Sequence, residues 1–388
     1  MSLVVDNRAA LSGQPGTHAL IIGVSEYPFL AGGSSPVADP WDMGQLSSTA
    51  TTAQKITDWI KAAQLPVPLA TCRLLLSPSA GETALAGIAD PATLDNVLAE
   101  ADAWRTDAST DPGNITLFYF AGHGIQRNKD DAVLCLHDFR RTPGAALMRA
   151  VDVATIRAGM SPAPARPNIA RTQFYFVDAC RVQPEQLAKF RPMETTGVFD
   201  EDLGGEDDRS SPIFYSSISN KAALAVPAGQ TLFSRALLEC LTGAGGDSVG
   251  EDAGGNPLWG VTVPSLNRAL EMRIEALNRQ LGADQTYTTG GQFKESKICF
   301  LPSAPLVDVQ VSIDPAAACA VGKLEVIAND NVVTLSQTAP VPQPFRHRLP
   351  AGLYAVVLSF NPPAPPFVNS SKFQAAKAPN ATWKVRVV

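Results

Sequence analysis

The chain has 388 residues, of which 45% are hydrophobic and 18% are charged, and its formal net charge is −6 at pH 7. This is the composition of an ordinary globular protein, and the length favours one large and one small domain. The negative charge argues against nucleic acid as a partner. Residues 1–17 lack the features of a secretory leader and no apolar run is long enough to span a membrane, so we expect a cytoplasmic protein without a membrane partner.

Short apolar runs alternate with helix-like stretches along the first half of the chain. This alternation favours an α/β fold, with a mostly parallel sheet between helical layers and right-handed crossovers. Residues 25–44 are rich in Gly, Pro and Ser and predict a loop. The pattern predicts strands at 18–24, 72–76, 115–120, 132–136, 174–177 and 213–217, and helices at 47–63, 91–105, 151–160, 233–241 and 265–281.

The pattern changes twice in the second half of the chain. Residues 181–212 are rich in turn-forming and charged residues, which predicts a long exposed loop of the kind that is often functional. From about Ser303 onward, a small β-sandwich of roughly 85 residues is predicted, because short strands are separated by Pro, Asn and Gly turns. Its strands are expected at 307–313, 323–327, 354–360 and 383–388.

Cysteine use points to a reducing compartment. The six cysteines lie far apart, and no CxxC pair is present to indicate zinc or a redox motif. Five of them have apolar neighbours, as expected for reduced cysteines packed in a core. The exception is Cys180, which closely follows a strand-like run and Asp178.

Two predicted strands end in residues that can carry out catalysis. The run 114–120 leads into Gly122-His123-Gly124, and the run 172–177 leads into Asp178-Ala-Cys180. Both ends lie at the same edge of a parallel sheet, so we expect the imidazole and the thiol to meet there. Such a pair can cleave a peptide bond, with the thiolate as nucleophile and the backbone N–H groups of Gly124 and Cys180 as an oxyanion hole.

These segments resemble the caspase-like clan of cysteine peptidases, near its metacaspase and bacterial caspase-like branch. The resemblance is carried by residues 18–28, by Phe118-Tyr-Phe-Ala-Gly-His-Gly124, by Phe174-Tyr-Phe-Val-Asp-Ala-Cys-Arg181, and by 214–218 leading to 232–238. It implies a hydrolase with His123 as general base and acid and Cys180 as nucleophile. It also implies that the peptidase domain, residues 1–302, is divided into a large-subunit part (about 1–181), a linker (about 182–212) and a small-subunit part (about 213–302). The β-domain predicted from the strand pattern covers 303–388.

Asp178 is the predicted specificity residue. In caspases that cut after aspartate, the residue two before the nucleophile is Gln, whereas metacaspases and paracaspases, which cut after Arg or Lys, carry Asp there. A carboxylate at the floor of the pocket attracts a guanidinium or ammonium group and repels an acidic one. The alternative is that Asp178 only caps the turn at the strand end. Ser216 is expected to join the substrate-binding set.

Two positions depart from the metacaspase pattern. Thr52 stands where relatives place a second pocket aspartate, and Ala121 stands where they usually have Ser, two before the catalytic His. We therefore expect one carboxylate in the pocket instead of two. The resemblance then implies cleavage after Arg, with Lys also accepted and with a weaker or broader preference.

The acidic loop carries two further hypotheses. Many relatives are zymogens that are cut in this loop, by themselves or by an upstream protease, and the basic residues here are Arg181, Lys189, Arg191 and Arg209. Its carboxylates also suit calcium, although a solvated acidic loop explains the same residues. Those carboxylates belong to Asp200, Glu201, Asp202, Glu206, Asp207 and Asp208.

Two alternatives to a free-standing peptidase remain open. One is a catalytically inactive caspase-fold scaffold whose β-domain binds partners. The other is a separase-like or CHAT-type effector that shares the His and Cys pair and acts on protein substrates within a bacterial defence or cell-death assembly.

Overall fold

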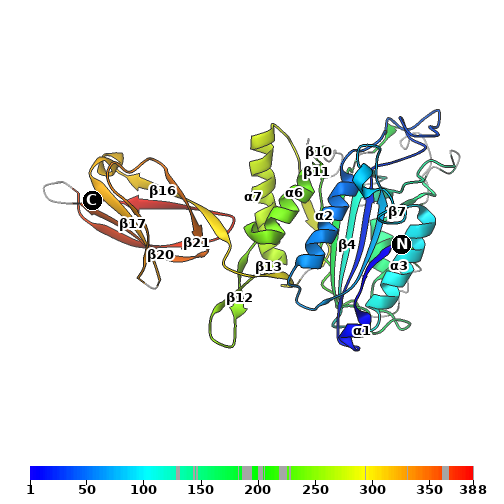
Figure 1. Cartoon of the computed structure of the whole chain (residues 1–388), viewed down its shortest axis with the longest axis horizontal. Coiled ribbons are helices and arrows are strands. Elements are labelled where there is room, and N and C mark those ends of the chain that lie inside the picture. Colours follow the sequence, from blue (N-terminus) through cyan, green and yellow to red (C-terminus); the bar gives the residue numbers. More distant parts are fainter. Residues whose placement is uncertain are drawn as a thin grey trace. The chain divides into compact units, whose positions relative to one another are not determined.

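The computed structural model divides into two compact units, and Figure 1 traces the chain through both. The first unit comprises residues 1–238 and 274–296, and the second comprises 239–273 and 297–388. This division differs from the expected boundary near 303, which stays a prediction. The residues described are 1–127, 132–142, 145, 147–181, 183–185, 195–199, 204, 206–217, 225–226, 229–292, 294–329, 331–360 and 367–387.

A seven-stranded sheet forms the centre of the first unit, in the order β1-β3-β2-β4-β8-β9-β14. Strands β3, β2, β4, β8 and β9 run parallel, whereas β1 and β14 are antiparallel to their neighbours at the two edges. The expected parallel sheet is confirmed, and the two edge strands were not predicted. The bounds are Leu3–Asp6 (β1), Thr17–Val24 (β2), Leu69–Ser77 (β3), Ile115–Gly122 (β4), Thr172–Ala179 (β8), Ile213–Tyr215 (β9) and Thr288–Gly290 (β14).

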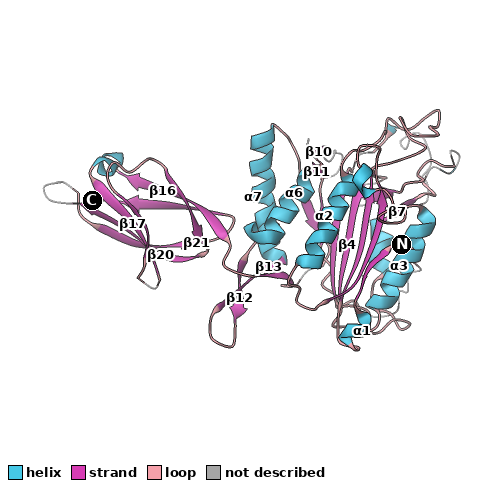
Figure 2. Cartoon of the chain, in the orientation of Figure 1, coloured by secondary structure: helices cyan, strands magenta, loops and turns pink. Residues whose placement is uncertain are grey.

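Helices cover both faces of this sheet, as Figure 2 shows for α2 and α3. Helix α2 (Thr49–Ala62) packs closely on β2 because Gly23 has no side chain: a Cβ there would lie 2.6 Å from the Cβ of Ala53. Helix α3 packs on the opposite face. The remaining bounds are Arg8–Leu11 (α1), Leu94–Ala108 (α3), Val153–Gly159 (α4), Leu232–Glu239 (α6) and Val263–Leu281 (α7), with 3₁₀ turns at Thr83–Leu85 and Ala316–Ala320 and a π-helical turn at Cys240–Ala244.

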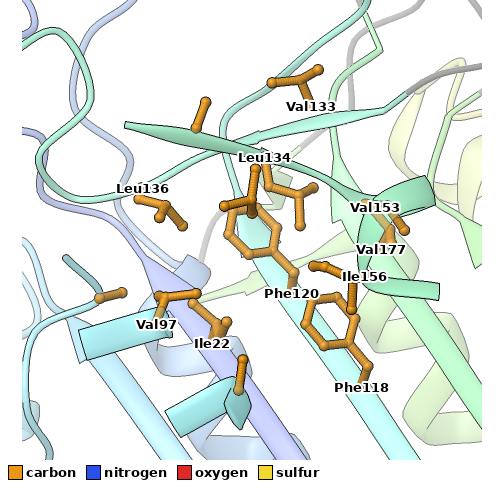
Figure 3. Close-up of a cluster of buried hydrophobic side chains, with 14 of the residues drawn as sticks. Ile22, Val97, Phe118, Phe120, Val133, Leu134, Leu136, Val153, Ile156 and Val177 are labelled. Atoms are coloured by element: carbon orange, nitrogen blue, oxygen red, sulfur yellow. The ribbon is translucent and has the colours of Figure 1, made fainter. Parts of the chain in front are cut away.

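A buried core fixes the two strands that matter most for function. Phe118 and Phe120 of β4 and Val177 of β8 pack with Val153 and Ile156 of α4 (Figure 3). Each is at most 2% exposed, and burial of such a side chain stabilises the fold by about 1.5–3 kcal/mol. The ends of β4 and β8 are therefore held in a fixed relation.

A small antiparallel sheet, β5-β6-β7, follows directly on β4. It contains the strand predicted at 132–136. Its strands are Gly124–Ile125 (β5), Val133–Cys135 (β6) and Ala150–Asp152 (β7), and a separate two-stranded ribbon is formed by Ala225–Val226 (β10) and Gln230–Thr231 (β11).

The predicted exposed loop at 181–212 is anchored at several described positions, so that prediction was wrong for them. Phe199 is 7% exposed, with the guanidinium of Arg105 4.0 Å from its ring centre. Arg209 is 5% exposed, and it donates to the carbonyl oxygen of Arg157 at 2.8 Å and to Gln173 Oε1 at 3.0 Å. The many acidic residues of the segment predicted exposure, and they gave no indication that Phe199 and Arg209 are buried.

The second unit contains a β-sandwich, as predicted. The sheets β19-β16-β22 and β18-β17-β20-β21 share one core that includes Val309, Val356 and Trp383. A further antiparallel sheet, β12-β13-β15, was not predicted. The strands are Asp247–Glu251 (β12), Pro257–Thr262 (β13), Lys297–Leu301 (β15), Leu306–Asp314 (β16), Gly322–Ala328 (β17), Val333–Gln337 (β18), Phe345–Pro350 (β19), Gly352–Phe360 (β20), Ser370–Ala376 (β21) and Asn380–Arg386 (β22).

Candidate active site

His123 and Cys180 lie at adjacent strand ends. The parallel register pairs Ala121 with Asp178 and Gly122 with Ala179, so the residues that directly follow the two strands are His123 after β4 and Cys180 after β8. Both residues line one pocket of about 170 Å³. The lining residues are Gln45, Leu46, Ser47, Ser48, Thr49, Gly122, His123, Asp178, Cys180 and Thr231.

The turn after His123 touches the backbone of the cysteine strand. A Cβ added to Gly124 would lie 2.4 Å from the carbonyl oxygen of Cys180 and 2.8 Å from the Cβ of Ala179. Real Cβ atoms do not approach other atoms so closely. Glycine is thus required at 124 to bring the two strand ends together.

The imidazole of His123 is oriented from both sides. Its Nε2 lies 2.7 Å from the carbonyl oxygen of Gly44. A carbonyl only accepts, so Nε2 carries the proton and Nδ1 of the neutral ring is left as a proton acceptor. The backbone N–H of His123 donates to the hydroxyl of Tyr27 at 2.7 Å, and the two rings lie 4.8 Å apart.

Burial lowers the pKa of His123 below its ordinary 6.5, and the hydrogen bond to Gly44 opposes this shift. The ring is therefore neutral at neutral pH, which is the state that a general base requires. The Gly44 carbonyl would stabilise the imidazolium once a proton is taken up, because the hydrogen bond then involves a charged donor.

Gln45, the residue after Gly44, binds the backbone of Tyr27, three residues after the end of strand β2. The side-chain amide of Gln45 accepts from the N–H of Tyr27 at 2.8 Å and donates to the carbonyl oxygen of Tyr27 at 2.9 Å. The Tyr27 hydroxyl, in turn, donates to the carbonyl oxygen of Cys135 at 3.2 Å. Tyr27 therefore links the 25–44 loop, the histidine turn and β6.

Asp178 lies at the pocket with one oxygen heavily bonded. Its Oδ2 accepts from Ser234 Oγ at 2.5 Å and from Thr231 Oγ1. The Ser234 hydroxyl lies 2.6 Å from the hydroxyl of Tyr119. Its Oδ1 is buried and has no hydrogen-bond partner among the described residues.

Burial raises the pKa of the Asp178 carboxyl, and the hydroxyl groups of Ser234, Thr231, Ser216 and Tyr119 oppose this shift. A buried carboxylate with an unbonded oxygen is expensive to maintain. A cation that entered the pocket would satisfy that oxygen and favour the ionised form.

Three predicted substrate-binding residues lie just behind the pocket lining. Thr52 is buried, and its hydroxyl donates to the carbonyl oxygen of Ser48 at 2.7 Å and accepts from the N–H of Thr231 at 3.3 Å. Ser216 is buried and donates to the carbonyl oxygen of Ala179 at 3.1 Å, and Ala121 is buried in β4. Their roles toward substrate stay predictions.

Three residues with direct roles in this geometry were missed from the sequence: Gly44, Thr231 and Ser234. Gly44 lies in a loop without periodicity. Thr231 also accepts from the N–H of Ser234 at 3.3 Å at the start of α6, so a hydroxyl there predicts a helix cap, not a partner for a distant acid. No signal in the sequence links either hydroxyl to Asp178.

The candidate cut sites in the linker differ in their surroundings. Arg181 and Arg209 are 6% and 5% exposed, and the Arg181 guanidinium lies 4.6 Å from the ring centre of Tyr215. Both side chains are buried, which makes these two positions poor cut sites in this fold, and processing of the linker stays a prediction. Lys189 and Arg191 lie outside the described residues.

The calcium hypothesis stays untested. Asp207 pairs with Arg209 and Asp208 with Arg171, each at 2.7 Å. Asp200, Glu201 and Asp202 lie outside the described part of the chain, and within that part no three His, Cys, Asp or Glu side chains are grouped to hold a metal. Of the helices that the structure describes, none has the length and apolar character needed to cross a membrane.

A mostly parallel sheet flanked by helices, with a His and a Cys at adjacent strand ends, is the arrangement expected of caspase-like cysteine peptidases. The sequence model of the caspase domain matches residues 17–252, so the chain belongs to the caspase family, as the resemblance implied. Among the curated proteins, none matches this chain.

Two solved structures are similar in outline. A protein from Geobacter sulfurreducens is 14% identical, with a TM-score of 0.42 over 73% of this chain and 95% of its own. Caspase-1 from Spodoptera frugiperda is 11% identical, with a TM-score of 0.42 over 74% of this chain and 89% of its own.

Proposed function

We propose that this chain is a cysteine endopeptidase that cleaves after basic residues, with Cys180 as nucleophile and His123 as general base and acid. The observation that supports it most is the buried carboxylate of Asp178, which lines the same pocket as the imidazole and the thiol. A pocket with an acid at its floor suits Arg or Lys next to the scissile bond.

The reaction begins when Nδ1 of the neutral His123 takes the proton of the Cys180 thiol. The thiolate attacks the scissile carbonyl carbon, forming a C–S bond and an oxyanion that the N–H groups of Gly124 and Cys180 would stabilise. His123 then gives its proton to the departing amine as the C–N bond breaks. His123 next takes a proton from a water molecule, whose oxygen attacks the thioester carbonyl carbon. The C–S bond breaks, the peptide leaves as the acid, and the imidazolium returns its proton to the Cys180 thiolate.

The test compares fluorogenic peptides that end in Arg, Lys or Asp, with wild type beside Cys180→Ala and Asp178→Asn. We expect cleavage after Arg and Lys only, no turnover by Cys180→Ala, and a loss of about 10²-fold or more in kcat/KM for Asp178→Asn, because a buried charge-assisted contact is removed. Equal signal from wild type and Cys180→Ala would refute the nucleophile. Unchanged cleavage by Asp178→Asn would refute the specificity residue.

Activation by processing belongs to the same proposal. The burial of Arg181 and Arg209 leaves Lys189 and Arg191 as the basic linker positions to examine. Intact-mass and peptide analysis of the purified protein, before and after it becomes active, would detect the cut. Full activity with every bond from 181 to 212 intact would exclude it. A defence or cell-death role is tested by identifying the cleaved termini of cellular proteins after the active enzyme is added.

The scaffold alternative is supported by the β-sandwich of the second unit, a common module for binding partners. It predicts that Cys180→Ala and wild type behave alike in every assay. It is weakened by the arrangement of His123, whose hydrogen bond to Gly44 leaves Nδ1 as the proton acceptor of a neutral ring.

A further inference from the structure

We propose that Asp178 receives the basic side chain of the substrate through one oxygen only, Oδ1, so that the pocket accepts Lys nearly as well as Arg. This inference rests on the proposed function and refines it. It identifies Thr231 and Ser234 as positioning residues that set the ratio between the two substrates.

The first step concerns Oδ2. A carboxylate oxygen has two lone pairs, and here both are occupied, one by the hydroxyl of Thr231 and one by the hydroxyl of Ser234. All three side chains are buried, at 0–5% exposure. Neither hydroxyl can turn to water, so Oδ2 is saturated from within the protein.

The second step concerns the direction of the hydrogen bonds. An ionised carboxylate only accepts, so the Ser234 proton points to Asp178, and the proton between Tyr119 and Ser234 must come from Tyr119. The chain therefore runs from Tyr119 through Ser234 to Oδ2. This fixes the Ser234 hydroxyl as a donor and strengthens its bond to the acid.

The third step concerns what remains for a ligand. Oδ1 has no partner among the described residues, and Asp178 is the one acid among those that line the pocket. Thr52, at the position of the second acid in relatives, has its hydroxyl engaged with Ser48 and Thr231. An incoming cation thus meets a single acceptor oxygen on a single carboxylate.

A single acceptor removes the main advantage of arginine. The guanidinium gains over an ammonium by donating two parallel N–H bonds to the two oxygens of one carboxylate. With Oδ2 saturated, that paired contact is unavailable, and either cation makes one charge-assisted bond. We expect the kcat/KM ratio of matched Arg and Lys peptides to be below about five in the wild type.

The experiment frees one lone pair of Oδ2. The variant Tyr119→Phe/Ser234→Ala removes one donor and leaves no tyrosine hydroxyl unpaired, and the matched control Tyr119→Phe keeps both donors on Oδ2. We expect kcat/KM to fall for both peptides in the double variant, because the carboxylate loses a donor. The Arg-to-Lys ratio should rise about tenfold, as one further bond to a charged group becomes available. The control should keep the wild-type ratio.

The outcomes separate the two levels of the argument. Cleavage of both peptides by the wild type with a ratio above about five, or a double-variant ratio within about threefold of the control, overturns the one-oxygen inference and leaves the proposed function standing. Cleavage of neither peptide overturns both. If the double variant does not fold, the wild-type ratio decides.

Discussion

Two glycines at the candidate site lead to opposite predictions, and the pair tests whether close approach of the strand ends controls activity. At Gly124, an added methyl would lie 2.4 Å from the carbonyl oxygen of Cys180, whereas ordinary contact begins at 3.4 Å. The histidine turn and the cysteine strand must therefore separate by about 1 Å, a displacement that typically costs about 10²-fold in rate. At Gly44, an added methyl would lie 3.4 Å from the carbonyl oxygen of Ala31, which is ordinary contact.

We therefore expect Gly124→Ala to lower kcat/KM about 10²-fold and to destabilise the fold by about 1–3 kcal/mol, because it overpacks a closed contact. The kcat/KM of Gly44→Ala should stay within about threefold of the wild-type value, because the backbone carbonyl that binds His123 is kept in the variant. Steady-state kinetics with the preferred peptide and urea unfolding give both quantities. Near-normal activity of Gly124→Ala, or an equal loss in Gly44→Ala, would refute this account of the dyad geometry.

Three other predictions follow from the contacts around the site. Burial lowers the pKa of His123 below its ordinary 6.5, so the fall of kcat/KM on acidification, as the base takes up a proton, should be centred below pH 6.5. An acid limb centred above 6.5 would contradict this. Tyr27→Phe removes the acceptor for the His123 N–H and the donor to the Cys135 carbonyl oxygen. It should lower the free energy of unfolding by about 1–3 kcal/mol in a thermal or urea melt. An unchanged melt would show that these two hydrogen bonds do not contribute to stability. Phe199→Ala should cost about 3–5 kcal/mol, whereas Phe373→Ala, 71% exposed, should cost about nothing; equal effects would show that the linker is not anchored through Phe199.

Much of this architecture was predictable because it depends on contiguous pattern. The apolar runs ending at His123 and Cys180 predicted two neighbouring parallel strands, and the register of β4 with β8 places their ends side by side. Asp178 followed from the same segment. Periodicity and strand ends are local properties, and these are what one sequence expresses well.

The partners of these residues were not predictable, because they are brought in by the fold. The partner that Gly44 provides is a backbone carbonyl, which any residue has, so the sequence gives no sign of it. The hydroxyls of Thr231 and Ser234 are those expected of residues at the start of a helix. The burial of Phe199 and Arg209 was likewise hidden within an acidic segment. The short strand β12, Asp-Ser-Val-Gly-Glu, lacks the alternation that would distinguish it from a loop.

The raised pKa of Asp178 means that protons and a positively charged group would compete for the same carboxylate. Burial shifts the carboxyl above its ordinary 3.8, so protons compete for it at a higher pH than for an exposed acid. A basic side chain that bound there would stabilise the ionised form and release the fraction of a proton that the carboxyl holds when the site is empty. Under the proposed function, recognition of a basic side chain and release of protons would therefore be one equilibrium, and binding of that side chain should weaken as the pH falls.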